Sequence, residues 1–159
     1  IDSICAADPR LECVIAGMGD YSASQGIAVK SGLDHDYPFD LWYYPRFRLC
    51  MAARAAGIDP VDGPYGNIKN VENYREECRR SMIIGCVGKW AIHPDQIEPA
   101  IEVFSPKQAD VDYARKLTRA YAEAEAKGLG AVNIDGQMVD VATVRMLSTI
   151  LVKADMIGM

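Results

Sequence analysis

The sequence of 159 residues lacks the features that mark several classes of protein. No apolar run approaches the roughly 18 residues of a membrane-spanning helix, so we expect no membrane partner. Basic residues number 17 against 22 acidic ones, and the net charge of −5 argues against a nucleic-acid partner. The length allows one domain with a sizeable core.

Paired cysteine motifs are also absent. The five cysteines are odd in number, and no two of them form a Cys-x-x-Cys pair. We interpret them as reduced, mostly buried thiols and therefore expect a cytoplasmic protein. A catalytic cysteine remains an alternative that the spacing does not favour.

The first residues resemble the middle of a protein more than its start. The chain begins with Ile1, and the stretch IDSICAADPR reads as a helix that Pro9 ends. Natural N-termini are more often polar and frayed, so we expect this chain to be the C-terminal part of a longer protein.

Apolar runs alternate with helical segments in the first two thirds of the chain. The runs at residues 11–17, 59–63 and 87–94 predict strands, of which the first looks buried. A helix in the second half of 39–56 should end at Gly57, and Asn70 can cap the next helix. This order is typical of parallel βα units, but three strands cannot close a barrel.

The pattern changes near Ser105. Ser105, Pro106 and Gln108 suggest a capping box for a helix that ends at Gly128. Asp135-Gly136 then predicts the turn of a hairpin, and a last helix covers about 141–156. We therefore divide the chain into an α/β portion, 1–105, and a helix–hairpin–helix extension, 106–159.

Asp20 lies among small residues in the stretch AGMGDYSASQG, just after the first predicted strand. Active sites form at the C-terminal ends of parallel strands, and Mg²⁺ commonly uses one or two protein carboxylates. Asp20 is therefore a candidate metal ligand. The alternative is that it serves only in a turn and caps the next helix.

Three further positions carry candidate chemistry. Asp140 is a good helix cap, or the hairpin delivers its carboxylate to an active site. His93 is a conceivable general base, although a hydrogen bond to the backbone at a strand–helix corner is favoured. Trp90 is expected in the core, with the mouth of a pocket as the alternative. We interpret His35, with Asp34 and Asp36, as part of a solvated loop.

Four stretches, in this order, resemble the malyl-CoA lyase branch of the HpcH/HpaI aldolase and citrate lyase β-subunit superfamily: GMGDYSASQG, DGPYGNIKN, GKWAIHPDQI and GLGAVNIDGQMVDVA. The resemblance covers essentially the whole chain. It implies the C-terminal part of a (β/α)₈ barrel, with about three parallel strands, followed by the extension. It also implies assembly as a trimer or hexamer.

By this resemblance, the reaction is the Mg²⁺-dependent, reversible Claisen-type cleavage of malyl-CoA or β-methylmalyl-CoA to acetyl-CoA or propionyl-CoA and glyoxylate, with Mn²⁺ as an alternative ion. Asp20 matches the family's metal-binding aspartate, and the backbone of Gly19 and Asp20 would lie beside the oxoacid. Asp140 matches the acid–base aspartate that reaches an adjacent subunit's site. The acyl-CoA pocket is implied at Trp90, Ile92, His93 and Pro94.

Two of the family's residues have no match in this sequence: a second metal-binding glutamate and a substrate-binding arginine. We therefore expect the isolated chain to be inactive. Arg79, Arg80 and Lys89 are candidates to contact the phosphates of coenzyme A, although the main contacts are expected elsewhere. Alternative functions are a citramalyl-CoA lyase, a citrate lyase β subunit, a malyl-CoA thioesterase, or a non-catalytic α/β assembly or binding module.

Overall fold

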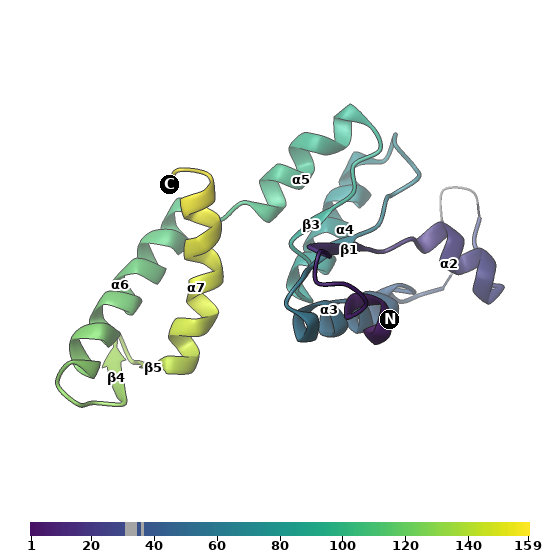
Figure 1. Ribbon diagram of the computed structural model, residues 1–159. Coiled ribbons are helices and arrows are strands. Elements are labelled where there is room, and N and C mark those ends of the chain that lie inside the picture. Colours follow the sequence, from purple (N-terminus) through teal and green to yellow (C-terminus); the bar gives the residue numbers. More distant parts are fainter. Residues whose placement is uncertain (31–34, 36) are drawn as a thin grey trace. The chain divides into compact units, whose positions relative to one another are not determined.

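The computed structural model describes residues 1–30, 35 and 37–159, and the chain divides into two compact units (Figure 1). The N-terminal unit is Ile1–Phe104, and the C-terminal unit is Ser105–Met159. In the described part of the chain, no helix has the length and apolar character needed to cross a membrane.

Three parallel strands form the sheet of the N-terminal unit, in the spatial order β1-β2-β3: β1 Cys13–Ile15, β2 Asp59–Asp62 and β3 Gly88–Lys89. Parallel neighbours need a crossover connection, which contains α3 (Tyr43–Ala56) in the first case and α4 (Val71–Ile83) in the second. The register places Asp62 beside Lys89. The predicted order of strands and helices is confirmed.

Local signals set the ends of the two crossover helices. Gly57 ends α3 with a φ of 73°, a left-handed conformation that glycine adopts without steric cost. The Asn70 side chain accepts a hydrogen bond from the Asn73 backbone N–H at 3.1 Å and so caps α4. A small core cluster under α3 contains Cys5, Ala52, Ala53 and Ile58, with Cys5 supplied by α1 (Asp2–Cys5).

The first strand is shorter and less buried than its sequence predicts. Only Cys13–Ile15 of the run 11–17 is a strand, and the Ile15 side chain is 43% exposed. Among the described residues β1 has one neighbour, β2, so one of its edges and part of its surface lack a covering strand. The prediction of a buried strand was therefore wrong for this chain by itself.

The third strand is also shorter than predicted, because the backbone turns to a different partner. Trp90 N–H still donates to the Asp62 carbonyl at 3.0 Å, but Ile92 N–H donates to the Gln96 side chain at 2.8 Å. Trp90 is 52% exposed, so its placement in the core was wrong. The segment continues into a 3₁₀ turn, η2 Pro94–Gln96, and then α5, Ile97–Phe104.

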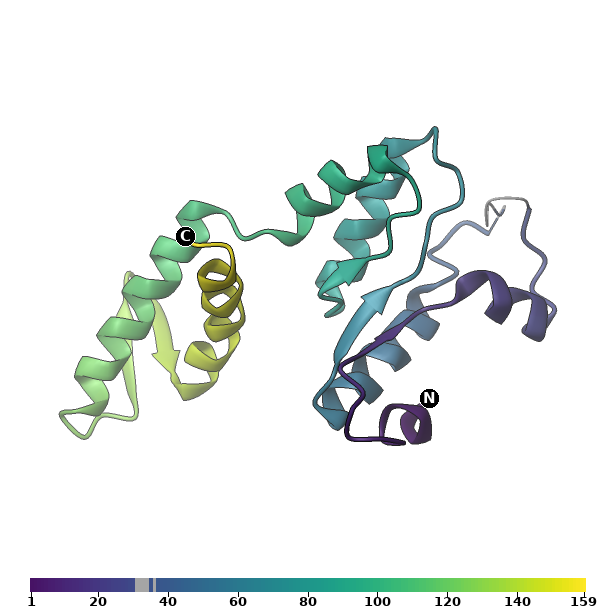
Figure 2. The ribbon, with the colours of Figure 1, turned by 45° about the horizontal axis from the view of Figure 1, so that its top comes forward.

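The C-terminal unit is a helix–hairpin–helix, as predicted (Figure 2). Its elements are α6 Gln108–Glu125, β4 Ala131–Ile134, β5 Gln137–Asp140 and α7 Val141–Met156. Asp135 and Gly136 both have positive φ, 52° and 83°, which is the signature of a tight two-residue hairpin turn. One face of the hairpin packs with both helices around Leu117, Tyr121 and Val139.

The expected capping box at Ser105 does not form. Helix α6 begins at Gln108, its N-cap residue is Lys107, and no side chain caps it. The Gln108 amide instead donates to the Asp112 carboxylate at 2.8 Å, one turn into the helix. The pattern Ser-Pro-x-Gln therefore predicted the correct helix, but it placed the N-cap residue two positions too early, at Ser105 instead of Lys107.

Candidate functional site

Asp20 lies in the first turn of helix α2 (Met18–Gln25), which begins three residues after β1 ends. Its side chain is exposed, and no described residue donates a hydrogen bond to its carboxylate. The backbone that precedes it is uncovered, since a β-carbon placed at Gly17 or Gly19 would meet no atom of another part of the chain within 4 Å. Asp20 is therefore free of structural partners within the described chain and accessible to a ligand.

The end of β2 fixes the backbone that leads to Asp20. Ala16 N–H donates to the Val61 carbonyl at 3.0 Å, and Gly63 packs directly against the Ala16 carbonyl. A β-carbon at Gly63 would lie 2.0 Å from that oxygen, far inside any tolerated contact. Because only glycine allows this approach, Gly63 is a packing residue for the segment that carries Asp20.

A buried cluster of charged side chains lies at the same strand ends. Asp62 is fully buried and receives Arg46 Nε at 2.9 Å on one carboxylate oxygen and Lys89 Nζ at 2.7 Å on the other. Glu77 pairs with both cations, at 3.1 Å to Arg46 and 2.8 Å to Lys89. Asp40 adds a contact with Arg46 at 3.2 Å. We call these five residues the Asp62 cluster.

Burial and charge act in opposite directions on Arg46. Burial alone lowers the pKa of its guanidinium, but the charges of Asp62, Glu77 and Asp40 outweigh burial and raise that pKa above its ordinary value. The Arg46 guanidinium is therefore charged and paired, and the ion pairs of the cluster join α3, α4, β2 and β3.

Sequence reasoning missed the Asp62 cluster, although one signal was available. Asp62 and Lys89 stand at aligned positions on two neighbouring strands, and Arg46 and Glu77 lie on the two crossover helices that follow β1 and β2. Lys89 had been a candidate contact for coenzyme A phosphates. That prediction was wrong, because the Lys89 side chain is 1% exposed and is paired twice.

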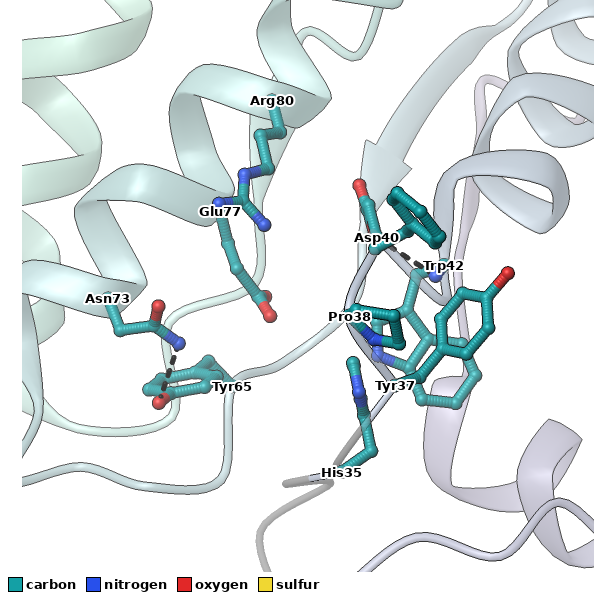
Figure 3. A pocket seen from close by; sticks show the side chains of 10 residues that line it. His35, Tyr37, Pro38, Asp40, Trp42, Tyr65, Asn73, Glu77 and Arg80 are labelled. Carbon is teal, nitrogen blue, oxygen red and sulfur yellow. Dashed lines mark hydrogen bonds between the residues drawn. The ribbon is translucent and has the colours of Figure 1, made fainter.

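A cavity of about 390 Å³ opens beside the cluster, between α4 and the segment that precedes α3 (Figure 3). Asn73, Glu77 and Arg80 line it from α4, and Asn73 donates to the Tyr65 hydroxyl at 2.8 Å. The opposite wall is mostly aromatic and consists of His35, Tyr37, Pro38, Phe39, Asp40 and Trp42. Asp20 is not among the residues that line this cavity.

His35 belongs to that aromatic wall and is not simply solvated. Its ring lies edge-on to Trp42 with centroids 6.4 Å apart, which corrects the expectation of a solvated loop at this residue. Asp34 and Asp36, which the same expectation included, lie outside the described residues. Among the described residues, no three side chains of His, Cys, Asp or Glu converge as a metal cluster.

The segment from Trp90 to Pro94 presents apolar surface to solvent. Trp90 is 52% and Ile92 50% exposed. His93 Nδ1 accepts a hydrogen bond from Asp95 N–H at 3.3 Å and caps the 3₁₀ turn that begins at Pro94, which confirms the interpretation of His93 as a corner residue. Gln96 anchors the segment, because its buried amide donates to the Tyr65 carbonyl at 3.0 Å.

Asp140 is the N-cap residue of α7, as its sequence context predicted. Its Oδ1 accepts hydrogen bonds from the Thr143 N–H and hydroxyl, both at 2.9 Å. These bonds from Thr143 hold the pKa of the Asp140 carboxyl below its ordinary value of 3.8. Both bonds use one carboxylate oxygen, so Oδ2 takes no part in either.

Residues 1–94 match the family HpcH/HpaI aldolase/citrate lyase. The chain belongs to this family. The matched range covers both strand ends described above, with Asp20, Gly63 and the Asp62 cluster, and it ends at Pro94.

Curated relatives in the HpcH/HpaI family match almost the whole chain. The L-malyl-CoA/beta-methylmalyl-CoA lyase of Rhodobacter capsulatus is 38% identical over 98% of this chain and 52% of the relative. The (3S)-malyl-CoA thioesterase of Cereibacter sphaeroides is 35% identical over 96% of this chain and 52% of the relative. The chain thus spans about half the length of these curated relatives.

A solved structure supports the fold class. The protein CitE of Mycobacterium tuberculosis, in complex with magnesium, acetoacetate and coenzyme A, matches with a TM-score of 0.72 and 27% identity. The match covers 97% of this chain and 55% of that chain. The predicted class, α/β with about three parallel strands of a (β/α)₈ barrel plus a helix–hairpin–helix, is confirmed.

Proposed function

We propose that this chain supplies two aspartates to a Mg²⁺-dependent carbon–carbon lyase that cleaves malyl-CoA or β-methylmalyl-CoA to acetyl-CoA or propionyl-CoA and glyoxylate. The observation that carries the proposal is the exposed Asp20 carboxylate, which has no described partner and follows uncovered backbone at the C-terminal end of a parallel strand. The resemblance to a lyase of that name over nearly the whole chain supports the substrate class.

Asp20 fits the role of one ligand to a magnesium ion. Mg²⁺ commonly takes one or two protein carboxylates and fills its octahedron with water and substrate oxygens. When bound, the ion acts as a Lewis acid toward the oxygens of the oxoacid. In this proposal Asp20 contributes one oxygen ligand, and the small residue Gly19 leaves room for the oxoacid beside the backbone. Further ligands come from outside the described residues.

Asp140 serves as the acid–base residue at the acetyl methyl carbon. The carboxylate is ionised at neutral pH and can accept a proton, although its lowered pKa makes it a weaker base than an ordinary aspartate. The Thr143 bonds fix its Oδ1, so the capping role orients the carboxylate and does not exclude chemistry. In this proposal Ser105–Met159 is the extension that carries Asp140 to an adjacent subunit of a trimer or hexamer, and Ile1–Phe104 belongs to the barrel.

The exposed Trp90–Pro94 segment forms part of the acyl-CoA pocket in this proposal. Trp90 and Ile92 offer apolar surface that a thioester chain can cover, while Gln96 holds their backbone in place. His93 contributes to the shape of the corner rather than to proton transfer, because its Nδ1 is already an acceptor for Asp95 N–H.

A malyl-CoA thioesterase is the second candidate, since a relative of that name matches nearly the whole chain at 35% identity. The two reactions differ in the bond that breaks. A lyase releases glyoxylate and acetyl-CoA, whereas a thioesterase releases malate and free coenzyme A. Product analysis therefore separates the two candidates with one substrate.

The test uses an enzyme in which the second metal-binding glutamate and the substrate-binding arginine are present together with this chain, since the chain by itself is expected to be inactive. The enzyme is supplied with malyl-CoA and Mg²⁺, and glyoxylate and malate are quantified. We expect glyoxylate, and we expect both Asp20→Ala and Asp140→Ala to reduce its formation by about 100-fold or more. The matched control is Asp110→Ala, because Asp110 occupies the same third position of an exposed helix start. Unchanged glyoxylate release in Asp20→Ala would refute the metal role, and malate as the main product would favour the thioesterase.

A further inference from the structure

Cys50 and Cys86 form a close pair of thiols that the lyase proposal does not use. Cys50 lies on α3, and Cys86 lies just before β3, 36 residues later in the sequence. Their sulfur atoms are 3.5 Å apart and share a hydrogen bond. Both side chains are buried, at 4% and 3% exposure, so neighbouring atoms hold the two sulfurs together.

The two thiols differ in acidity. The hydrogen bond with Cys86 lowers the pKa of Cys50, and the nearby charge of Arg54 acts in the same direction, against the effect of burial. The same hydrogen bond and burial raise the pKa of Cys86 well above its ordinary value. The charge of Arg54 acts on Cys50, so we assign Cys50 as the attacking sulfur and Cys86 as the resolving one.

The other cysteines do not have this arrangement. Burial raises the pKa of Cys78 to about 11, and the thiol packs against Tyr65 and Tyr74. Cys5 packs in the Ala52–Ala53 cluster, while Cys13 is exposed on β1. Within the described chain, Cys50–Cys86 is the pair of sulfurs in hydrogen-bond contact.

We propose that Cys50 and Cys86 are an oxidation site at which a hydroperoxide forms an intramolecular disulfide. The Cys50 thiolate attacks one peroxide oxygen, so that an S–O bond forms, the O–O bond breaks and hydroxide leaves. The Cys86 sulfur then attacks the Cys50 sulfur, which forms the S–S bond and breaks the S–O bond. Two thiols lose two electrons and two protons, and one hydrogen peroxide becomes two waters.

The geometry requires only a small movement for this step. The sulfurs must close from 3.5 Å to the roughly 2.05 Å of a disulfide, a movement of about 1.5 Å. A glycine, Gly85, precedes Cys86 with a φ of 113°, and even a β-carbon placed there would only be in ordinary contact with Cys50.

The bond would join the two elements that clamp Asp62. Cys50 follows Arg46 by one helical turn on α3, and Cys86 precedes Lys89 by three residues. Both Arg46 and Lys89 pair with Asp62, so the disulfide would covalently link α3 to the segment before β3, two parts of the chain that the Asp62 cluster already joins through ion pairs. This inference is independent of the lyase proposal, because that proposal assigns no role to either cysteine.

The test treats the native protein with hydrogen peroxide, alkylates it after unfolding, and maps the peptides by mass spectrometry. The Cys13→Ser variant serves as the background, because it removes the exposed thiol and with it intermolecular cross-links. We expect a linked peptide pair that contains Cys50 and Cys86, the loss of alkylation at both, and full recovery after reduction with dithiothreitol.

Two variants keep the test decisive. In Cys50→Ser or in Cys86→Ser the linked pair must disappear, and either variant that folds suffices for this control. Complete alkylation of Cys50 and Cys86, at a peroxide dose that oxidises Cys13 in the unmutated protein, would overturn the proposal. Sulfinic acid at Cys50 without any cross-link would overturn it too, because Cys86 would then fail to resolve the intermediate.

Discussion

The ends of two neighbouring strands carry aspartates with opposite surroundings. Asp20, just beyond β1, is exposed and accepts no hydrogen bond from the described residues. Asp62, at the end of β2, is fully buried and pairs with Arg46 and Lys89. The two strand ends are in direct contact through Gly63 and Ala16.

This difference separates two roles that the sequence alone does not distinguish. Asp62 has both oxygens occupied by cations and therefore holds the scaffold, whereas Asp20 has its oxygens available for a ligand that the chain does not supply. The scaffold residue positions the backbone, and the exposed residue carries the chemistry in the proposed function. Asp140 combines a structural and a proposed chemical role, because its Oδ1 caps a helix while its Oδ2 takes no part in those bonds.

The largest effect on stability is expected at Asp62. Asp62→Asn keeps the size of the side chain but leaves two buried cations with less negative charge, which typically costs about 3–5 kcal/mol. Chemical denaturation of the native protein and the variant measures the loss. The control is Asp59→Asn at the other end of β2, where an exposed pair with Arg54 at 3.3 Å should change stability by about 0.5 kcal/mol or less. Equal effects at both sites would contradict the assigned role of the cluster.

A smaller effect is expected at Gly63. In Gly63→Ala the new methyl group would start 2.0 Å from the Ala16 oxygen, so the two strand ends must separate. Forced overpacking of this kind costs about 1–3 kcal/mol, and the displaced segment should also weaken the Mg²⁺ response of the enzyme. Denaturation and Mg²⁺ titration of activity measure the two consequences. Gly130→Ala is the matched control, because a β-carbon there meets no atom within 4 Å.

The next effect concerns the cap at Asp140 and depends on pH. Since folding lowers the pKa of Asp140 below 3.8, its stabilisation is present above that pH and is lost as the pH falls through the folded value. Asp140→Ala should therefore lower the melting temperature at pH 7, and the difference from the native protein should shrink at pH 3. Asp140→Asn should keep much of the stability, because asparagine also caps helices, yet lose turnover. A temperature difference that stays constant over this range would contradict the cap.

The sequence predicted most of the local features of the chain, although the capping box at Ser105 does not form. The ends of helices at Gly57, Asn70 and Asp140, and the turn at Asp135-Gly136, depend on residues within four positions of each other. Such short-range conformational preferences can be read from the chain directly. The same locality explains why the interpretation of His93 as a corner residue was correct.

The features that sequence reasoning missed depend on contacts between distant residues. Arg46, Asp62 and Lys89 come from three separate elements: the strand register places Lys89 beside Asp62, and the packing of α3 brings Arg46 to the same carboxylate. Trp90 is exposed where the third strand ends, since the Ile92 N–H donates to the Gln96 side chain and not to a neighbouring strand. A pattern of hydrophobic residues does not predict this change of hydrogen-bond partner. The close approach of Gly63 to Ala16 likewise exists only in the folded sheet.

The most direct test of Asp20 as a metal ligand is a comparison of Mn²⁺ affinity between the unmutated enzyme and Asp20→Ala. Mn²⁺ is a paramagnetic substitute for Mg²⁺, so electron paramagnetic resonance measures its binding. We expect little change in stability in Asp20→Ala, because the side chain has no described partner, together with at least about tenfold weaker Mn²⁺ binding. Asp110→Ala, altered at the equivalent position of α6, should bind the ion as the native protein does. Equal Mn²⁺ affinity in the native protein and in Asp20→Ala would contradict the central claim that this carboxylate is a metal ligand.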